Sequence, residues 1–226
     1  MRNILCLKCG SKYTENYVTK LYNMVEKYSN YDYNFYCITD QPFAYKNIKI
    51  IPLPEYGLQG WWNKPYIFSD LGVSGTNLFL DIDAVICNDM EPLWSYEEKQ
   101  SVFYSDVVGV KPFNLSTAVM RFESNSLLHL WDDFYADRHS IIGSMKGDQD
   151  YVRLKISNPV FYPDNWLKSY KYELRGTRYL IKGADRTANR LYPGIPKIND
   201  DLIIAIIHGH PKNHNITDQW FVENWQ

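Results

Sequence analysis

The sequence predicts a single α/β domain in which helices flank a mostly parallel, layered central sheet. Short apolar runs typical of buried strands alternate with stretches whose apolar residues recur every three or four positions, as on one face of a helix. This alternation favours parallel strands joined by helical connections. The 226 residues contain no internal repeat and no convincing linker, so we expect one domain spanning residues 1–226.

The first third of the chain carries clear start and stop signals for its elements. Thr14 stands where an N-cap is expected, directly before a stretch with apolar residues at helical spacing. Pro52 and Pro54 end an apolar run that reads as a strand, because proline cannot donate to a strand ladder. We expect strands at residues 3–7, 33–39 and 48–53 and helices at 14–28 and 61–70.

The rest of the chain continues the alternation. An apolar strand at 77–80 runs directly into Asp81-Ile-Asp83, and the most apolar run of the protein, 202–207, ends at His208. Residues 170–197 are irregular and polar. We further expect strands at 102–104 and 116–122 and helices at 126–136, 148–155 and 217–225.

Composition excludes several classes of function. The net charge is −2 and the 24 basic residues are scattered, so the basic stripe needed for nucleic-acid binding is missing. No apolar stretch of about 18 residues predicts a transmembrane helix. The apolar run at the start is too short for a signal peptide. We therefore expect a cytoplasmic protein, and leave peripheral association with a membrane open. The oligomeric state is not predicted.

The four cysteines favour a structural interpretation. Cys6 and Cys9 have a spacing that can serve redox chemistry or zinc, but Cys37 and Cys87 lie too far apart in sequence to form the second close ligand pair of a zinc site. We interpret the four as small apolar residues on and after buried strands.

Asp81 and Asp83 form the strongest local signal. In a parallel sheet, ligands bind beyond the carboxyl ends of the strands, and both aspartates stand just past such an end. Two carboxylates this close repel each other unless a cation joins them, and oxygen ligands suit Mg²⁺ or Mn²⁺. The alternative is a pair of solvated turn aspartates, one of them capping a helix.

Two further motifs carry possible chemistry. In His208-Gly-His210-Pro-Lys212, a histidine would complete a mixed oxygen and nitrogen shell around Mn²⁺, and Lys212 would offer a point charge to phosphate. In Gly147-Asp148-Gln149-Asp150, the acids are explained equally well by capping of a helix N-terminus.

Taken in order, seven segments resemble the GT-A glycosyltransferases of family 8, the glycogenin and lipopolysaccharide galactosyltransferase type, and more closely small bacterial and phage glycosyltransferases. Each motif is moderately specific; the ordered set runs from end to end and is stronger. The segments are Cys-Leu-Lys-Cys-Gly-Ser-Lys-Tyr (6–13), Phe-Tyr-Cys-Ile-Thr-Asp (35–40), Gly-Trp-Trp-Asn-Lys-Pro (60–65), Leu-Phe-Leu-Asp-Ile-Asp (78–83), Asn-Leu-Ser-Thr-Ala-Val-Met-Arg-Phe (114–122), Gly-Asp-Gln-Asp (147–150) and Ile-His-Gly-His-Pro-Lys (207–212).

The resemblance implies a single GT-A domain that moves a sugar from a nucleotide-sugar donor, with a UDP-sugar favoured, to a glycan or glycoconjugate acceptor. It implies retention of anomeric configuration and Mn²⁺ or Mg²⁺ as cofactor. The implied roles are metal ligands (Asp81, Asp83, His208), donor binding (Lys8, Gly10, Tyr13, Lys64, Asp81, Lys212) and catalysis near the transferred sugar (Asp148, Gln149).

The sequence departs from the family at its C-terminal motif. That motif usually reads His-x-x-Gly-x-x-Lys-Pro, whereas here Lys212 follows His208 by four residues and Asn213 replaces the proline. His210 or His214 therefore stays open as the metal ligand. Lys64, taken alone, is equally compatible with a surface lysine.

Two other functions remain as alternatives. A haloacid-dehalogenase-type phosphatase also places Asp-x-Asp after a strand, with one aspartate as nucleophile. However, it needs a later strand that ends in paired acids, and Asp200-Asp201 precede an apolar strand instead. The second alternative is a nucleotide-sugar-binding module without turnover.

Overall fold

The computed structural model describes residues 1–98, 100–105, 114–175 and 196–226. Within them, the main sheet has seven strands in the order β3-β2-β1-β4-β7-β6-β8. Neighbouring strands pair in parallel except that β7 is antiparallel to both β4 and β6, so β7 alone runs against the other six. The expected mostly parallel sheet is confirmed. Its strands are β1 (Arg2–Lys8), β2 (Asn34–Thr39), β3 (Ile48–Pro52), β4 (Thr76–Leu80), β6 (Val102–Ser105), β7 (Leu115–Glu123) and β8 (Val160–Phe161).

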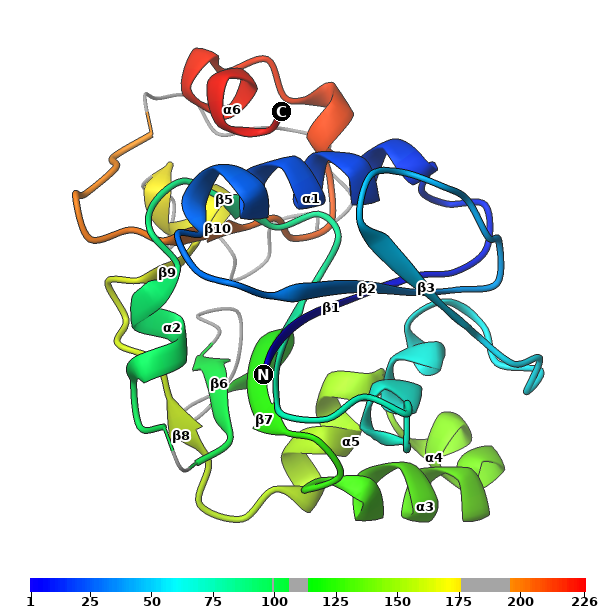
Figure 1. The fold of residues 1–226 in the computed structure, drawn as a ribbon. Coiled ribbons are helices and arrows are strands. Elements are labelled where there is room, and N and C mark those ends of the chain that lie inside the picture. Colours follow the sequence, from blue (N-terminus) through cyan, green and yellow to red (C-terminus); the bar gives the residue numbers. More distant parts are fainter. Residues whose placement is uncertain (99, 106–113, 176–195) are drawn as a thin grey trace.

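Helices cover both faces of this sheet (Figure 1). On one face, side chains of α1 pack against Ile4 and Cys6 of β1. On the other, Leu5 packs with side chains from the helical segments between β3 and β4 and after β7. Successive strand residues thus feed opposite layers. The helical segments are α1 (Glu15–Tyr28), η1 (Gly60–Phe68), α2 (Glu91–Ser95), α3 (Leu128–Ala136), α4 (Arg138–Ser144), α5 (Asp148–Lys155), η2 (Tyr170–Leu174), η3 (Asn213–Asn215) and α6 (Gln219–Asn224).

Two sequence-based expectations change in detail, and the expected N-cap of α1 is confirmed. The helix expected at 61–70 is the 3₁₀ segment η1, which contains Pro65. Proline lacks the N–H that an α-helical bond needs, which disfavours a regular α-helix here. Thr14 does occupy the N-cap position of α1, without a hydrogen bond from its side chain. Part of the irregular stretch 170–197 forms η2, and residues 176–195 lie outside the described residues.

A second, three-stranded sheet has the order β5-β10-β9 and joins two of the sequence motifs. β5 (Val85–Ile86) begins two residues after Asp83, and β10 (Ile204–Ile206) ends two residues before His208. The two strands pair antiparallel, with Ala205 opposite Val85. β9 (Leu167–Ser169) pairs with the other side of β10.

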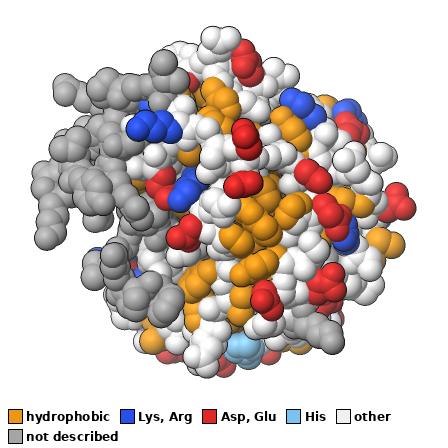
Figure 2. All heavy atoms as spheres, turned by 90° about the vertical axis from the view of Figure 1, so that its left-hand side faces the viewer, with side chains coloured by type: hydrophobic (Ala, Val, Ile, Leu, Met, Phe, Trp, Pro, Cys, Tyr) orange, Lys and Arg blue, Asp and Glu red, His pale blue; other side chains and the backbone are white. Residues whose placement is uncertain are grey.

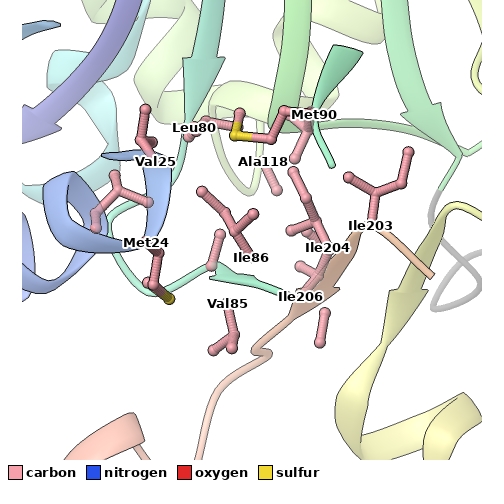
Figure 3. Close-up of a cluster of buried hydrophobic side chains, with 14 of the residues drawn as sticks. Met24, Val25, Leu80, Val85, Ile86, Met90, Ala118, Ile203, Ile204 and Ile206 are labelled. Carbon is pink, nitrogen blue, oxygen red and sulfur yellow. The ribbon is translucent and has the colours of Figure 1, made fainter. Parts of the chain in front are cut away.

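Apolar packing holds this small sheet against the rest of the molecule. Figure 3 shows Val85, Ile86, Ile204 and Ile206 gathered beside Met24 and Val25 of α1 and near Leu80 and Ala118. All of these side chains are buried. Full burial of a Val or Ile side chain contributes about 1.5–3 kcal/mol, so this cluster anchors the chain on both sides of the site described next.

The face that contains α2 and β8 shows a central patch of hydrophobic side chains with acidic side chains around it (Figure 2). In this part of the fold the rings of Tyr96, Tyr162 and Trp166 pack together, with centroids 5.5–6.4 Å apart. No helix within the described residues is long and apolar enough to cross a membrane.

Candidate active site at the carboxyl end of β4

Lys64 joins two motifs that are far apart in the sequence. Its Nζ lies 2.7 Å from Oδ1 of Asp81 and 3.7 Å from Oδ2 of Asp148. Thr117, on β7, donates to the same oxygen of Asp148 at 2.6 Å. η1 presents the lysine, the end of β4 presents Asp81, and the first turn of α5 presents Asp148. These three elements meet at one edge of the sheet.

Asp83 is the centre of a second set of contacts. Its Oδ2 accepts a hydrogen bond from the Tyr13 hydroxyl at 3.1 Å and lies 3.5 Å from Nζ of Lys212. The backbone carbonyl of Asp83 accepts a hydrogen bond from Nδ2 of the buried Asn213 at 3.0 Å. The C-terminal motif is therefore fixed to the Asp-x-Asp motif by one side-chain bond and one ion pair.

Between these groups lies a cavity of about 270 Å³, which we call the inner cavity. It is bounded by the residues after β1, by the start of η1 and by the turn after β4. Such a concave space with a few converging polar groups at the end of parallel strands is where a ligand is expected. Its lining residues are Leu7, Cys9, Lys12, Tyr13, Gly60, Trp61, Lys64, Asp81, Ile82 and Asp83.

Burial sets the electrostatics of this site. Burial raises the pKa of Asp81 to about 6, although Lys64 acts in the opposite direction. For Lys64, burial alone would lower the pKa, but Asp81 and Asp148 together raise it above its usual value. Burial also raises the pKa of Tyr13, with Asp83 as the next cause, so its phenol remains a hydrogen-bond donor at neutral pH.

The acids and bases around the cavity are balanced. Lys64 pairs with Asp81 and Asp148, and Lys212 pairs with Asp83. A third lysine, Lys12, lies on the cavity wall and is attracted electrostatically by Asp83 and Asp81. With the three lysines charged, the cluster is formally neutral when all three acids are ionised. A ligand with two negative charges, bound together with a divalent cation, would preserve that neutrality.

Two carboxylates on one cavity wall are a suitable oxygen donor set for Mg²⁺ or Mn²⁺. The expected triad of Asp81, Asp83 and His208 is not preassembled: among the described residues, no group of three or more His, Cys, Asp or Glu side chains is arranged to hold a metal ion. A cation at this site would be coordinated by Asp81 and Asp83 and by oxygen atoms of the molecule bound in the cavity.

The three C-terminal histidines have different surroundings. The half-buried His208 lies beside Tyr172, with ring centroids 5.8 Å apart. His210 is exposed, and its carbonyl accepts a hydrogen bond from Lys171 Nζ at 2.8 Å. His214 is exposed, and its Nδ1 lies 2.7 Å from the Tyr17 hydroxyl. Of this motif, Lys212 and Asn213 are the residues that contact Asp83.

Three other predicted site residues lie less centrally. Lys8 is buried, and its Nζ donates to Gln41 Oε1 at 2.8 Å; it does not line the inner cavity. Gly10 lies on the loop after β1, and its N–H donates to Asp40. Gln149 is half-buried on α5, next to Asp148.

Sequence reasoning missed four residues at the site. Lys12 and Trp61 line the cavity, and both lie within motifs that were recognised, Cys6–Tyr13 and Gly60–Pro65. Thr117 is a buried polar residue of β7 within the recognised segment 114–122, but Ser116 and Arg121 are buried on the same strand, so its polarity alone does not single it out. The fourth, Asn213, stands where the family pattern has proline, and its contact with Asp83 depends on the tertiary fold.

Solved structures with the same architecture were found over nearly the whole chain. The galactosyltransferase LgtC aligns with 98% of this chain and 94% of its own, at 13% identity and a TM-score of 0.64. A structure of LgtC with an active-site substitution gives a TM-score of 0.66 at 12% identity and the same coverage. The chain has a GT-A fold.

Two larger glycosyltransferases share this GT-A fold. GlyE of Streptococcus pneumoniae TIGR4 aligns with 99% of this chain and 60% of its own, at 12% identity and a TM-score of 0.69. The bifunctional glycosyltransferase WbbM aligns with 98% of this chain and 49% of its own, at 14% identity and a TM-score of 0.60. No protein-family model and no curated protein matches the sequence.

Proposed function

We propose that this protein is a glycosyltransferase that moves a sugar from a nucleotide-sugar donor to a hydroxyl group of a glycan or glycoconjugate. The observation that carries the proposal is the convergence of Lys64, Asp81 and Asp83 on one cavity at the carboxyl ends of the strands. Asp148 and Lys212 are paired with these residues, Asp148 with Lys64 and Lys212 with Asp83. The GT-A fold, shared with proteins described as glycosyltransferases, supports the same conclusion. By analogy with other glycosyltransferases, we also propose that the enzyme acts in the cytoplasm, at or near a membrane surface.

The donor diphosphate is proposed to bind beside Tyr13. Nζ of Lys12 and Nζ of Lys212 each lie 5.2 Å from the centroid of the Tyr13 ring, so two positive charges flank one flat ring. Two ammonium groups can hold the diphosphate oxygens as point charges, and the ring offers an apolar face to a nucleoside. A uracil nucleotide is our first choice because of the resemblance to family 8.

Asp81 and Asp83 are proposed to hold Mn²⁺ or Mg²⁺. The cation, when bound, would act as a Lewis acid on the diphosphate oxygens. When the cation binds, it takes over oxygens of Asp81 and Asp83 that now pair with Lys64 and Lys212. Both lysines can then contact the diphosphate. His208 is proposed as a third ligand only if the segment around it moves on binding.

The residues of this chain are proposed to act mainly through electrostatics. As the sugar–phosphate bond breaks, charge builds up on the leaving diphosphate, and Lys212 and Lys12 stabilise it. Lys64 holds Asp148 in place, so that its side-chain oxygens can accept hydrogen bonds from sugar hydroxyls, with Gln149 beside it. Retention of configuration is proposed from the resemblance, with the acceptor hydroxyl attacking on the face from which the diphosphate leaves.

The two alternatives predict different experimental results. A phosphatase of the haloacid-dehalogenase type would need a free carboxylate nucleophile, whereas Asp81 is paired with Lys64, and the fold comparisons favour glycosyl transfer. A binding module would take up the donor without any turnover.

The experiment is a thermal-shift panel of UDP-, GDP-, CMP- and dTDP-sugars with Mn²⁺, Mg²⁺ or EDTA, followed by chromatographic detection of released nucleotide. Asp83→Asn is compared with Asp32→Asn, an exposed residue just before β2 and therefore at the opposite edge of the sheet. We expect a metal-dependent shift for one nucleotide class, with turnover, that D83N loses and D32N keeps. The absence of any metal-dependent shift would overturn the assignment of Asp81 and Asp83, and a shift without turnover would favour the binding module.

A further inference from the structure

A second, larger cleft adjoins the inner cavity. Its volume is about 590 Å³, and it shares Cys9 and Gly60 with the inner cavity. Its walls come from the residues after β1 and β2 and from the loop between β3 and η1. We call it the outer cleft, lined by Cys9, Gly10, Asp40, residues 53–60 and Asn63.

The loop that forms one wall of the outer cleft is fixed by side-chain hydrogen bonds and by the backbone conformation of two glycines. The buried Asn63 donates from Nδ2 to the carbonyls of Gly60 at 3.1 Å and Leu58 at 3.3 Å. Gly57 and Gly60 have φ of +70° and +54°, a region that residues with a Cβ rarely adopt. The loop is thus fixed by its own sequence, which indicates a preformed binding surface.

The chemistry of the lining selects against anions. Asp40, Glu55 and Gln59 supply carboxylate and amide groups, and no Lys, Arg or His is among the described residues that line the cleft. Asp40 accepts the Gly10 N–H at 2.9 Å, and an ionised carboxylate has acceptor capacity left for further donors. Such a surface suits a neutral ligand rich in hydroxyl groups rather than a phosphate.

Aromatic rings extend the cleft outward. Tyr56, in the cleft wall, packs against Trp131 and Tyr135 of α3 with ring centroids 5.1 Å apart in each pair. Tyr135 is 38% exposed. Flat rings with a polar edge suit the apolar faces of sugars, so a chain that fills the cleft can continue over this aromatic surface.

The position of the outer cleft fits the acceptor rather than the donor nucleotide. Lys12 and Tyr13, which we assign to the diphosphate and nucleoside, line the inner cavity but not the outer cleft. Gly10, which the resemblance assigns to the donor, does line the outer cleft, but its N–H donates to Asp40. The two spaces share Cys9 and Gly60, and Trp61, the neighbour of Gly60, lines the inner cavity but not the outer cleft. A molecule in the outer cleft therefore meets the inner cavity at Cys9 and Gly60, and the outer cleft itself holds neither Lys12 nor Tyr13.

We propose that the outer cleft binds the acceptor as an uncharged chain of several sugar units, with the unit that receives the transferred sugar at Gly60 and later units along Asp40, Glu55 and Tyr56. This inference rests on the proposed function and specifies its substrate class: an oligosaccharide or polysaccharide rather than a monosaccharide or a small aglycone.

The test measures direct binding by calorimetry, which needs no turnover. The full chain is titrated with oligosaccharides of one to six glucose, galactose, N-acetylglucosamine or rhamnose units. For at least one series we expect Kd to fall at least tenfold between one and four units. Glu55→Ala and Gln59→Ala should raise Kd by about 3- to 10-fold, the effect of one or two lost hydrogen bonds. Tyr135→Ala should weaken only the longer chains, and Glu98→Ala, exposed and remote from the cleft lining, serves as control.

The outcomes separate this inference from the proposed function. No binding in any series, no dependence on length, or equal affinities for the Glu55, Gln59 and Glu98 variants would each overturn the outer cleft as acceptor site. Competition between oligosaccharide and UMP would also overturn it and assign the cleft to the donor nucleoside. Failure of the donor panel, with oligosaccharide binding that Glu55→Ala weakens, would overturn the glycosyl transfer alone.

Discussion

The Nζ atom of Lys64 lies 2.7 Å from Oδ1 of Asp81 and 3.7 Å from Oδ2 of Asp148. One lysine thus neutralises the first aspartate of the Asp-x-Asp motif and the aspartate that begins α5. Because all three side chains are at least two-thirds buried, removal of any one leaves the others inadequately compensated.

Replacement of Lys64 by methionine should destabilise the protein and couple strongly to Asp81. We expect Lys64→Met to lower the free energy of unfolding by about 2–3 kcal/mol, because two buried carboxylates lose their cation. In a double-mutant cycle with Asp81→Asn, the two effects should be non-additive by about 1 kcal/mol or more. Urea denaturation of the four proteins gives these values.

Lys64→Arg is the matched control for this cycle, because it keeps the charge. Additive effects of Lys64→Met and Asp81→Asn would contradict the pairing of the two side chains. Stability of Lys64→Arg as low as that of Lys64→Met would assign the loss to packing rather than charge.

The stability contribution of Asp81 should depend on pH. Its pKa in the folded protein is raised to about 6 by burial, against about 3.9 in an unfolded chain. The folded state therefore holds its proton more tightly, so the contribution is present below about pH 4 and is lost as pH rises through about 6. We expect the difference in unfolding free energy between wild type and Asp81→Asn to change by about 2 kcal/mol between pH 4.5 and 7.5, with the wild type losing stability relative to the variant as pH rises.

Chemical denaturation across this pH range, without divalent cations, measures that difference. A constant difference would show that Asp81 titrates alike in the folded and unfolded chains. A change of opposite sign would show that Lys64 outweighs burial and lowers the pKa of Asp81.

The sequence predicted those features that depend on local pattern. The strand expected at 3–7 is the centre of β1 and the strand expected at 77–80 is all of β4 except its first residue, because four consecutive buried residues in each leave a recognisable run. Asp81 and Asp83 could be located for the same reason: they follow that run directly. By contrast, β5 and β8 have two residues each, too short for any periodicity to indicate them.

Contacts between distant segments explain most of what remained unpredicted. Lys8 and Lys12 occur in one motif, and no local pattern indicates that Lys8 pairs with Gln41 while Lys12 lines the inner cavity. Similarly, Thr117 acquires its role from α5, which places Asp148 beside it 31 positions later. The sequence was enough to recognise the motif, but the direction in which each of its side chains points depends on the tertiary structure.

Asn213 should orient Lys212 through its hydrogen bond to the Asp83 carbonyl. Its Nδ2 to carbonyl distance is 3.0 Å, and the side chain is buried. Asn213→Leu should cost about 1–2 kcal/mol of unfolding free energy, because the partly buried carbonyl of Asp83 loses its partner. It should also raise the Kd for the metal–donor complex about tenfold, because Lys212 is no longer fixed near Asp83.

Thermal melts and donor titrations measure these two effects, with the exposed Asn215→Leu of η3 as control. Equal donor affinities for the two variants would contradict the positioning role of Asn213. A loss of stability without loss of affinity would restrict Asn213 to the fold.

Arg121 should be the most sensitive structural position remote from the cavity. Its side chain is fully buried on β7 and donates to the carbonyls of Trp94 and Glu97, each at 2.6 Å, and to those of Leu93 and Gln100. These acceptors lie in α2 and in the residues after it. One guanidinium on β7 therefore connects the C-terminal end of that helix to the main sheet. Arg121→Met keeps the length of the side chain but leaves the carbonyls without this donor, and we expect a loss of about 3–4 kcal/mol measured by urea denaturation.

Arg121→Lys separates charge from geometry at this position. A lysine has three donors on one atom, so it cannot span carbonyls that a planar guanidinium reaches with two separate nitrogens, and it should recover less than half of the loss. Neither substitution touches the inner cavity, so the donor Kd measured below the melting temperature should stay within about twofold of wild type. A loss below about 1 kcal/mol for Arg121→Met would mean that water replaces the guanidinium and that α2 is held by its apolar contacts through Leu93 and Trp94.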